Sequence, residues 1–272
     1  MLAVRTLTAV ALLAALLAAV FFLDRALFAV LTGAILAVAA HEWAALSRLS
    51  GSAAIAYAAG CAALYGAVAA FAWPIETSAM PVIAILVAAA AFWALVVPLW
   101  LARGMQSSSH VLLAAAGVAV LVPAALAMAA LPPWQLLAIL FLVWISDTAA
   151  YFVGRRFGRH KLAPSVSPGK TIEGAVGAVL ASLAYAVILA MTMPAIGAYV
   201  TGLAWAAYAA AAMLLCASGI LGDLFESGAK RYAGVKDSGK LLPGHGGVLD
   251  RVDAVCAALP VGALLVTWAG IR

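Results

Sequence analysis

The chain has very little charge for its length. Only 9% of its 272 residues are Asp, Glu, Lys or Arg, whereas 68% are hydrophobic; soluble domains have roughly 25% and 45–50%. A chain of this size with so few polar side chains cannot cover a water-facing surface, so a soluble globular fold is excluded. Intrinsic disorder is excluded as well, because it requires low hydrophobicity and high net charge. The composition therefore indicates an integral membrane protein.

Cysteine is also scarce and has no pattern. Cys61, Cys216 and Cys256 stand singly in apolar stretches. An odd number without C-x-x-C or zinc-like spacing argues against disulfides and structural zinc, so we interpret all three as small buried hydrophobic residues. A P-loop is absent too, since Pro164 stands where its first glycine would. No haem signature and no nucleic-acid-binding module is present, so no nucleic acid is expected as a partner.

Long apolar runs are abundant, and about 20 such residues suffice to cross a bilayer. We predict an all-α polytopic membrane protein with nine transmembrane helices. The spans are 6–23, 26–47, 53–73, 81–101, 111–131, 134–153, 174–193, 199–221 and 254–271. The first run could be a signal peptide, but its length favours a retained helix. We expect five spans in an N-terminal region, 1–133, and four in a catalytic region, 134–272, with two charged cytoplasmic loops.

The distribution of basic residues predicts the orientation. If the loop after the sixth span is cytoplasmic, only Arg25 and Arg272, of 15 Lys and Arg, lie outside. The positive-inside rule then places the N-terminus in the cytoplasm. Charge is also concentrated, because 17 of the 25 charged residues fall in 143–173 and 222–253. We therefore expect the chemistry at the cytoplasmic surface of the membrane.

The segment after the eighth predicted span combines an acid, a hydroxyl and a base. Asp223, Ser227 and Lys230 stand at i, i+4 and i+7, so they share one face of a helix. A carboxylate can bind a hard cation, while the hydroxyl and ammonium can hold phosphate oxygens. The alternative is a helix end at which basic residues reach the membrane surface beside an acidic partner.

A glycine-rich loop and two further acids follow. Residues 236–240 lead into Pro-Gly-His-Gly-Gly at 243–247, and the N–H groups of such a loop can form an anion-binding nest. Asp250 and Asp253 share a face at the start of the ninth helix, where the helix dipole alone would also favour them. With Asp223 from another helix they predict a Mg²⁺ site, since Mg²⁺ prefers carboxylates, water and substrate phosphates.

The other charged window begins inside the sixth span. Asp147 and Tyr151 share a helix face there, and an acid at that depth is expected to face the bundle interior or a wet cavity. The basic, Gly/Pro-bent segment 154–174 follows. We interpret it as a cytoplasmic loop that can meet phosphates, although its arginines could serve topology alone.

Glu42 is a further intramembrane acid. His41-Glu42 resembles the start of a zinc motif, but Ala45 occupies the position of the second ligand. We expect Glu42 to pair with another helix, the alternative being a place at the edge of the site.

Together these residues resemble a known signature. The stretch from Ser227 to Asp253 resembles that of phosphatidate cytidylyltransferases, the CDP-diacylglycerol synthases. The matching residues are Ser227, Lys230-Arg231, Lys236-Asp237, Gly239, Pro243-Gly244-His245-Gly246-Gly247 and Asp250-Arg251-Val252-Asp253. A second block resembles the family at Asp147, Gly154-Arg155, Ser167-Pro168, Lys170-Thr171 and Glu173-Gly174. The resemblance covers the last four spans; the first five resemble the family only in hydropathy.

The resemblance implies that CTP and phosphatidic acid react to give CDP-diacylglycerol and pyrophosphate, with Mg²⁺ and a second cation as an open alternative. It also implies a homodimer among membrane lipids, in the inner membrane if the source is bacterial. The implied roles are catalytic for Asp223, Lys230, Asp250 and His245, phosphate binding for Ser227, Arg231, Lys170, Arg155 and Lys236, and metal binding for Asp223, Asp250 and Asp253.

Other functions fit less well. A CTP-using polyprenol or phytol kinase would share nucleotide and membrane, but would release CDP. A CDP-alcohol phosphotransferase lacks support, because its D-x₂-D-G-x₂-A-R pattern is absent. A transporter or channel is permitted by nine spans and Asp147. It is disfavoured because the charges crowd one membrane surface rather than the midplane.

Overall fold

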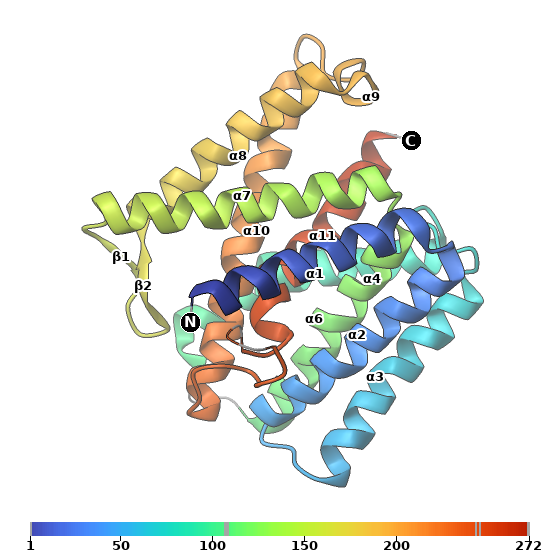
Figure 1. The fold of residues 1–272 in the computed structure, drawn as a ribbon, viewed down its shortest axis with the longest axis vertical. Coiled ribbons are helices and arrows are strands. Elements are labelled where there is room, and N and C mark those ends of the chain that lie inside the picture. The colour runs from blue at the N-terminus through green and yellow to red at the C-terminus, as the bar shows by residue number, and fades with distance from the viewer. Residues whose placement is uncertain (1, 106–108, 243, 245, 271–272) are drawn as a thin grey trace.

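The computed structural model describes residues 2–105, 109–242, 244 and 246–270, with side chains from Thr6 onward, and this part of the chain is largely helical (Figure 1). In order, the elements are α1 (Leu2–Phe22), α2 (Arg25–Leu46), α3 (Ser52–Phe71), α4 (Met80–Ala91), the π-helical segment η1 (Phe92–Val96), α5 (Val97–Arg103), α6 (His110–Ala130), α7 (Pro133–Phe157), β1 (Lys161–Ala163), β2 (Ser167–Thr171), α8 (Ile172–Thr192), α9 (Pro194–Gly197), α10 (Ala204–Ala233) and α11 (Leu249–Ala269).

The helices confirm the predicted class of fold. In the described residues, eight helices are long and apolar enough to cross a membrane, with Met80–Arg103 counted as one. They correspond to eight of the nine predicted spans. The first prediction, 6–23, falls on α1, whose apolar stretch Thr6–Phe22 is shorter. The protein is therefore an all-α polytopic membrane protein, while the orientation and the division after residue 133 stay predictions.

Helix α10 differs most from its predicted bounds. The predicted span 199–221 begins five residues before α10, which runs from Ala204 to Ala233 and so continues twelve residues past the end of that span. Thirty residues make a helix of about 45 Å, longer than the roughly 30 Å hydrocarbon core. Its polar turns can therefore extend past the lipid tails. The helix ends at Gly234, whose φ of 74° suits a left-handed C-terminal glycine.

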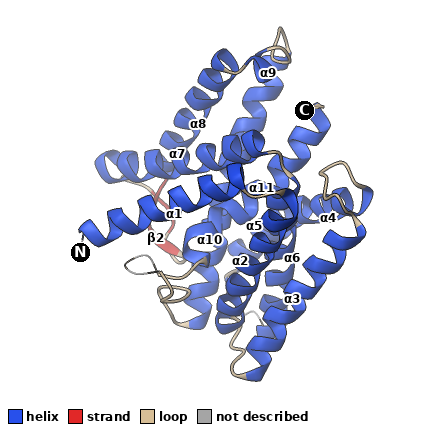
Figure 2. Ribbon diagram, turned by 45° about the vertical axis from the view of Figure 1, so that its right-hand side comes forward, coloured by secondary structure: helices blue, strands red, loops and turns tan. Residues whose placement is uncertain are grey.

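A small hairpin replaces the loop expected between the sixth and seventh spans. β1 and β2 pair antiparallel, with Lys161 opposite Thr171. Glu173 closes the base of the hairpin, since its carboxylate accepts hydrogen bonds from the backbone N–H of Arg159 at 3.0 Å and of His160 at 3.2 Å. The hairpin lies where α7 ends and α8 begins (Figure 1). At the other end of α8, helices α8 and α9 and the start of α10 extend together beyond the rest of the bundle (Figure 2).

An aromatic cluster joins the two halves of the chain. Phe225 of α10 has the rings of Trp43, Phe92, Trp93 and Trp100 around it, with ring centroids 5.5 to 5.9 Å away. These rings come from α2, η1 and α5, so three N-terminal elements contact the same turn of α10. The N-terminal helices thereby hold the polar end of α10 in place.

Helices α2, α3 and α6 approach one another closely at Gly117. The indole Nε1 of Trp43 donates a hydrogen bond to the carbonyl oxygen of Leu113 at 2.8 Å. A Cβ at Gly117 would collide with the Trp43 ring and the Tyr57 hydroxyl. Only a glycine therefore fits this contact.

We predict that Gly117→Ala lowers the Tm of the detergent-solubilised protein by several degrees. The extra methyl group must displace buried rings, and overpacking of this kind costs roughly 1–3 kcal/mol. Gly66→Ala in α3 is the matched control, because nothing lies within 4 Å of its added Cβ. Equal Tm values for the two variants would contradict the close packing.

Candidate active site

A polar cavity of about 630 Å³ lies among α7, α8, α10, α11 and the hairpin. Among the described residues, four carboxylates and three basic side chains from separate parts of the chain line it. They are Asp147, Asp223, Asp250 and Asp253, with Arg155, Lys170 and Arg251. The two charged segments of the sequence therefore meet in one place, and Asp147 lines a polar cavity as expected.

Asp223 connects α10 to the hairpin. Its Oδ2 lies 2.6 Å from the Nζ of Lys170 on β2, and its Oδ1 accepts a hydrogen bond from the Ser227 hydroxyl at 3.2 Å. The side chains of Lys170 and Asp223 are 24% and 34% exposed. An ion pair with this much solvent contact is weak, so either partner can exchange it for a cation or a phosphate.

Lys230 lies between two carboxylates. Its Nζ is 2.6 Å from Glu226 Oε2 and 2.8 Å from Asp250 Oδ1, and all three side chains are at most 14% exposed. Lys230 is not among the residues that line the cavity. The sequence placed Lys230 on the same helix face as Asp223 and Ser227. In the structure Lys230 binds Glu226, a residue that sequence analysis did not single out. The i, i+4 spacing of Glu226 and Lys230 was the available signal.

Asp250 organises the glycine-rich loop. Its Oδ2 accepts hydrogen bonds from the backbone N–H of Ser238 at 3.0 Å and of Gly247 at 2.8 Å. Gly246, at φ 82°, accepts a hydrogen bond from the N–H of Leu242 at 2.9 Å through its carbonyl oxygen. Because Oδ1 binds Lys230, both oxygens of Asp250 have partners.

The remaining predicted residues are placed more loosely. Arg155 Nη1 donates to the Tyr151 hydroxyl at 3.1 Å on the cavity wall. Arg231 Nε donates to the carbonyl oxygen of Val166 at 3.3 Å and so ties α10 to the hairpin. Lys236 is exposed in the loop after α10. His245 lies outside the described residues.

The acids of the cavity suit a metal that keeps part of its ligand sphere for the substrate. Among the described residues, no three His, Cys, Asp or Glu side chains form a ready metal-binding group. Asp223, Asp250 and Asp253 nevertheless line one cavity. Mg²⁺ takes one or two carboxylates and completes its octahedron with water and substrate phosphates. This donor set therefore fits Mg²⁺ that arrives with a polyphosphate.

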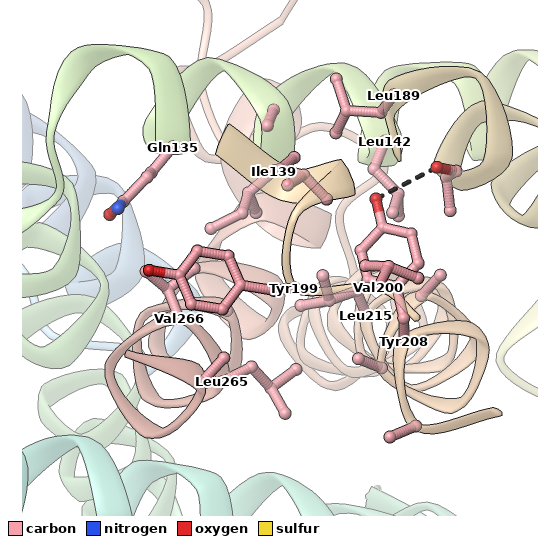
Figure 3. Close-up of a pocket in the computed structure, with 18 of the residues that line it drawn as sticks. Gln135, Ile139, Leu142, Leu189, Tyr199, Val200, Tyr208, Leu215, Leu265 and Val266 are labelled. Carbon is pink, nitrogen blue, oxygen red and sulfur yellow. Dashed lines mark hydrogen bonds between the residues drawn. The ribbon is translucent and has the colours of Figure 1, made fainter. Parts of the chain in front are cut away.

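A second, apolar cavity of about 430 Å³ lies farther along the same four helices. Figure 3 shows Tyr199 and Tyr208 on its walls, with the Tyr208 hydroxyl donating to the carbonyl oxygen of Ala186 at 3.1 Å. Along the helices, buried residues separate the cavities; Ser146, Ala178, Ser182 and Cys216 are at most 1% exposed. The polar cavity is thus closed at this end.

We predict that Lys230→Met destabilises the protein much more than Arg231→Met. The first variant leaves the buried Glu226 and Asp250 without their cation, and breaking a buried pair costs about 3–5 kcal/mol. Arg231 is the matched control, because it is the next residue, has the same charge and is exposed. Thermal unfolding in detergent measures the difference. Similar Tm values would show that Lys230 does not neutralise this pair.

Comparison with known proteins agrees with the geometry. The model of the cytidylyltransferase family matches residues 3–269. A phosphatidate cytidylyltransferase of Pseudomonas aeruginosa is 40% identical over 290 residues, which cover 99% of this chain and 98% of that protein.

Two further relatives match about half of the chain. A phosphatidate cytidylyltransferase of Haemophilus influenzae is 47% identical over 128 residues, 46% of this chain and 43% of that protein. One of Staphylococcus saprophyticus is 44% identical over 124 residues, 46% of this chain and 45% of that protein. With a family match over nearly its whole length and a relative covered from end to end, the chain belongs to the cytidylyltransferase family, among relatives named phosphatidate cytidylyltransferase.

Proposed function

We propose that this protein transfers CMP from CTP to phosphatidic acid, giving CDP-diacylglycerol and pyrophosphate. The observation that carries the proposal is the polar cavity, in which four carboxylates and three basic side chains converge in a chain of this family. Such a site matches the two demands of the reaction, which are cation binding and phosphate binding.

The chemistry needs positioning more than it needs a reactive side chain. A phosphate oxygen of phosphatidic acid attacks the α-phosphorus of CTP and forms a new P–O bond. The bond from that phosphorus to the oxygen that bridges to the β-phosphate breaks, and its electron pair leaves with pyrophosphate. Phosphoryl-type transfer of this kind depends mainly on alignment and on stabilisation of negative charge.

Basic side chains on three sides of the cavity supply phosphate contacts. We assign phosphate binding to Lys170, Arg155 and Arg251, which line the cavity from β2, α7 and α11. Lys170 would exchange Asp223 for a phosphate oxygen when nucleotide enters. The guanidinium groups of the two arginines can bind phosphate oxygens in a bidentate manner. Among these three, Arg251 was not a predicted site residue, although it stands in the D-R-x-D motif.

We assign the metal site to Asp223, Asp250 and Asp253. Mg²⁺ held there, alone or with a second cation, would neutralise charge on the triphosphate. Lys230 acts on Asp250, since it holds Oδ1 at 2.8 Å and does not line the cavity. Ser227 likewise orients Asp223, because its hydroxyl donates a hydrogen bond to Asp223 Oδ1. For Arg231, Lys236 and His245, direct contact with substrate stays a prediction.

The location and assembly of the enzyme complete the proposal. We place the cavity on the cytoplasmic face of the membrane, in the inner membrane of a bacterium, where soluble CTP and a membrane lipid can both reach it. The distribution of basic residues supports this side. We further propose that the protein works as a homodimer among membrane lipids.

We predict that purified protein in detergent converts phosphatidic acid and labelled CTP into lipid-soluble label and pyrophosphate when Mg²⁺ is present. Asp223→Asn and Asp250→Asn should each lower kcat by about 100-fold or more, because each removes charge at a site of electrostatic stabilisation. Glu76→Gln is the control, since Glu76 is an exposed acid in the loop before α4. Release of CDP with a phosphorylated lipid would favour a kinase, and no consumption of CTP by folded protein would contradict the proposal.

The orientation has a separate test. Arg159→Cys before the hairpin should react with a membrane-impermeant thiol reagent in inside-out vesicles only, and Ser78→Cys in right-side-out vesicles only. Both positions are exposed, and the three native cysteines are buried, so background labelling should be low. The opposite labelling pattern would reverse the proposed topology.

A further inference from the structure

Glu42 of α2 is a buried acid that belongs to neither the metal-binding nor the phosphate-binding side chains assigned above. It is 7% exposed and does not line the polar cavity. In the described part of the chain, no Lys, Arg or His lies within ion-pair distance of its carboxylate. A buried carboxylate without a cation is stable only when hydrogen bonds satisfy it.

Three donors from the C-terminal region bind this carboxylate. Oε2 accepts from the Ser238 hydroxyl at 3.0 Å and from the backbone N–H of Leu249 at 2.9 Å. Oε1 accepts from the N–H of Val248 at 3.0 Å. The loop after α10 passes beside the end of α2 in Figure 1. Glu42 therefore connects two segments that are about 200 residues apart in sequence.

Glu42 acts as a cap for α11 from another helix. Leu249 is the first residue of α11, and Val248 at its N-cap makes no side-chain capping bond. The first N–H groups of a helix need an acceptor, and negative charge is favoured there by the helix dipole. Glu42 supplies both the acceptor oxygens and the negative charge to α11, the helix that carries Asp250 and Asp253.

Two glycines allow the carboxylate to approach the loop. A Cβ on Gly239 or on Gly247 would collide with the Glu42 carboxylate. Both glycines belong to the signature segment 227–253, so the composition of that segment is explained in part by a residue far outside it.

The same loop is held from its other side by Asp250. The backbone N–H groups of Ser238 and Gly247 donate to Asp250 Oδ2 at 3.0 and 2.8 Å. Ser238 thus binds one carboxylate through its hydroxyl and another through its N–H. A shift of the loop away from Glu42 would move the donors that orient Asp250.

We propose that Glu42 is a positioning residue for nucleotidyl transfer. It fixes Ser238, Val248 and the start of α11 so that Asp250 and Asp253 face the cavity, and it does not touch substrate. This inference rests on the proposed function, because it assigns Glu42 a part in that reaction.

The test compares Glu42→Gln and Ser238→Ala with Thr32→Val in the full-length protein. Thr32 is the matched control, since it is a buried polar residue of α2 whose hydroxyl donates only within its own helix, to Phe28 at 2.8 Å. Kinetic constants for CTP and phosphatidic acid are measured together with hydrogen–deuterium exchange of the Val248 and Leu249 amides.

Glu42→Gln should lower kcat about 10- to 100-fold, the range for residues that orient metal ligands, with KM for phosphatidic acid unchanged. Amide exchange at 248 and 249 should accelerate. Ser238→Ala should change kcat in the same direction by less, and the double variant should lose less than the product of the two effects, because both act through one carboxylate. Thr32→Val should match wild type.

Faster exchange with an unchanged kcat would overturn the proposal, because Glu42 would then be structural only. Unchanged exchange would overturn it as well. If Glu42→Gln does not fold, Ser238→Ala decides through the same two measurements. If wild-type protein does not consume CTP, the proposed function fails, whereas the exchange data still show whether Glu42 holds the loop.

Discussion

The network of hydrogen bonds around Asp250 is the constraint on which the site depends. One oxygen binds Lys230, and the other accepts the N–H groups of Ser238 and Gly247. A single carboxylate thus joins α10, α11 and the glycine-rich loop. Because Asp223 lines the same cavity and is paired with Lys170, the orientation of Asp250 relative to Asp223 sets the space in which a polyphosphate and its cation must fit.

The N-terminal helices support this arrangement, although none of their described side chains lines the cavity. The aromatic rings around Phe225 fix the turn of α10 that precedes Glu226, and Glu42 fixes the start of α11. An apolar region of simple composition therefore positions both the polar end of α10 and the start of α11.

The sequence was sufficient for the class of fold, for most spans and for the acids of the cavity, because hydropathy and helical spacing are local signals. It was insufficient for contacts between distant segments. That Lys230 binds phosphate stays a prediction, whereas its contact with Asp250 was missed, because Asp250 lies 20 residues away and comes close only when α10 and α11 pack. The hairpin was missed because its strands are short, and the cap that Glu42 provides was missed because capping rules refer to neighbouring residues.

The most direct measurement is an experimental structure of the protein with Mg²⁺ and a CTP analogue that cannot react at the α-phosphate. The account predicts that the triphosphate lies in the polar cavity, with its oxygens against Lys170 and Arg251 and its cation against Asp223 and Asp250. Nucleotide bound elsewhere, with Lys170 still paired to Asp223, would contradict the assignment of this cavity as the active site.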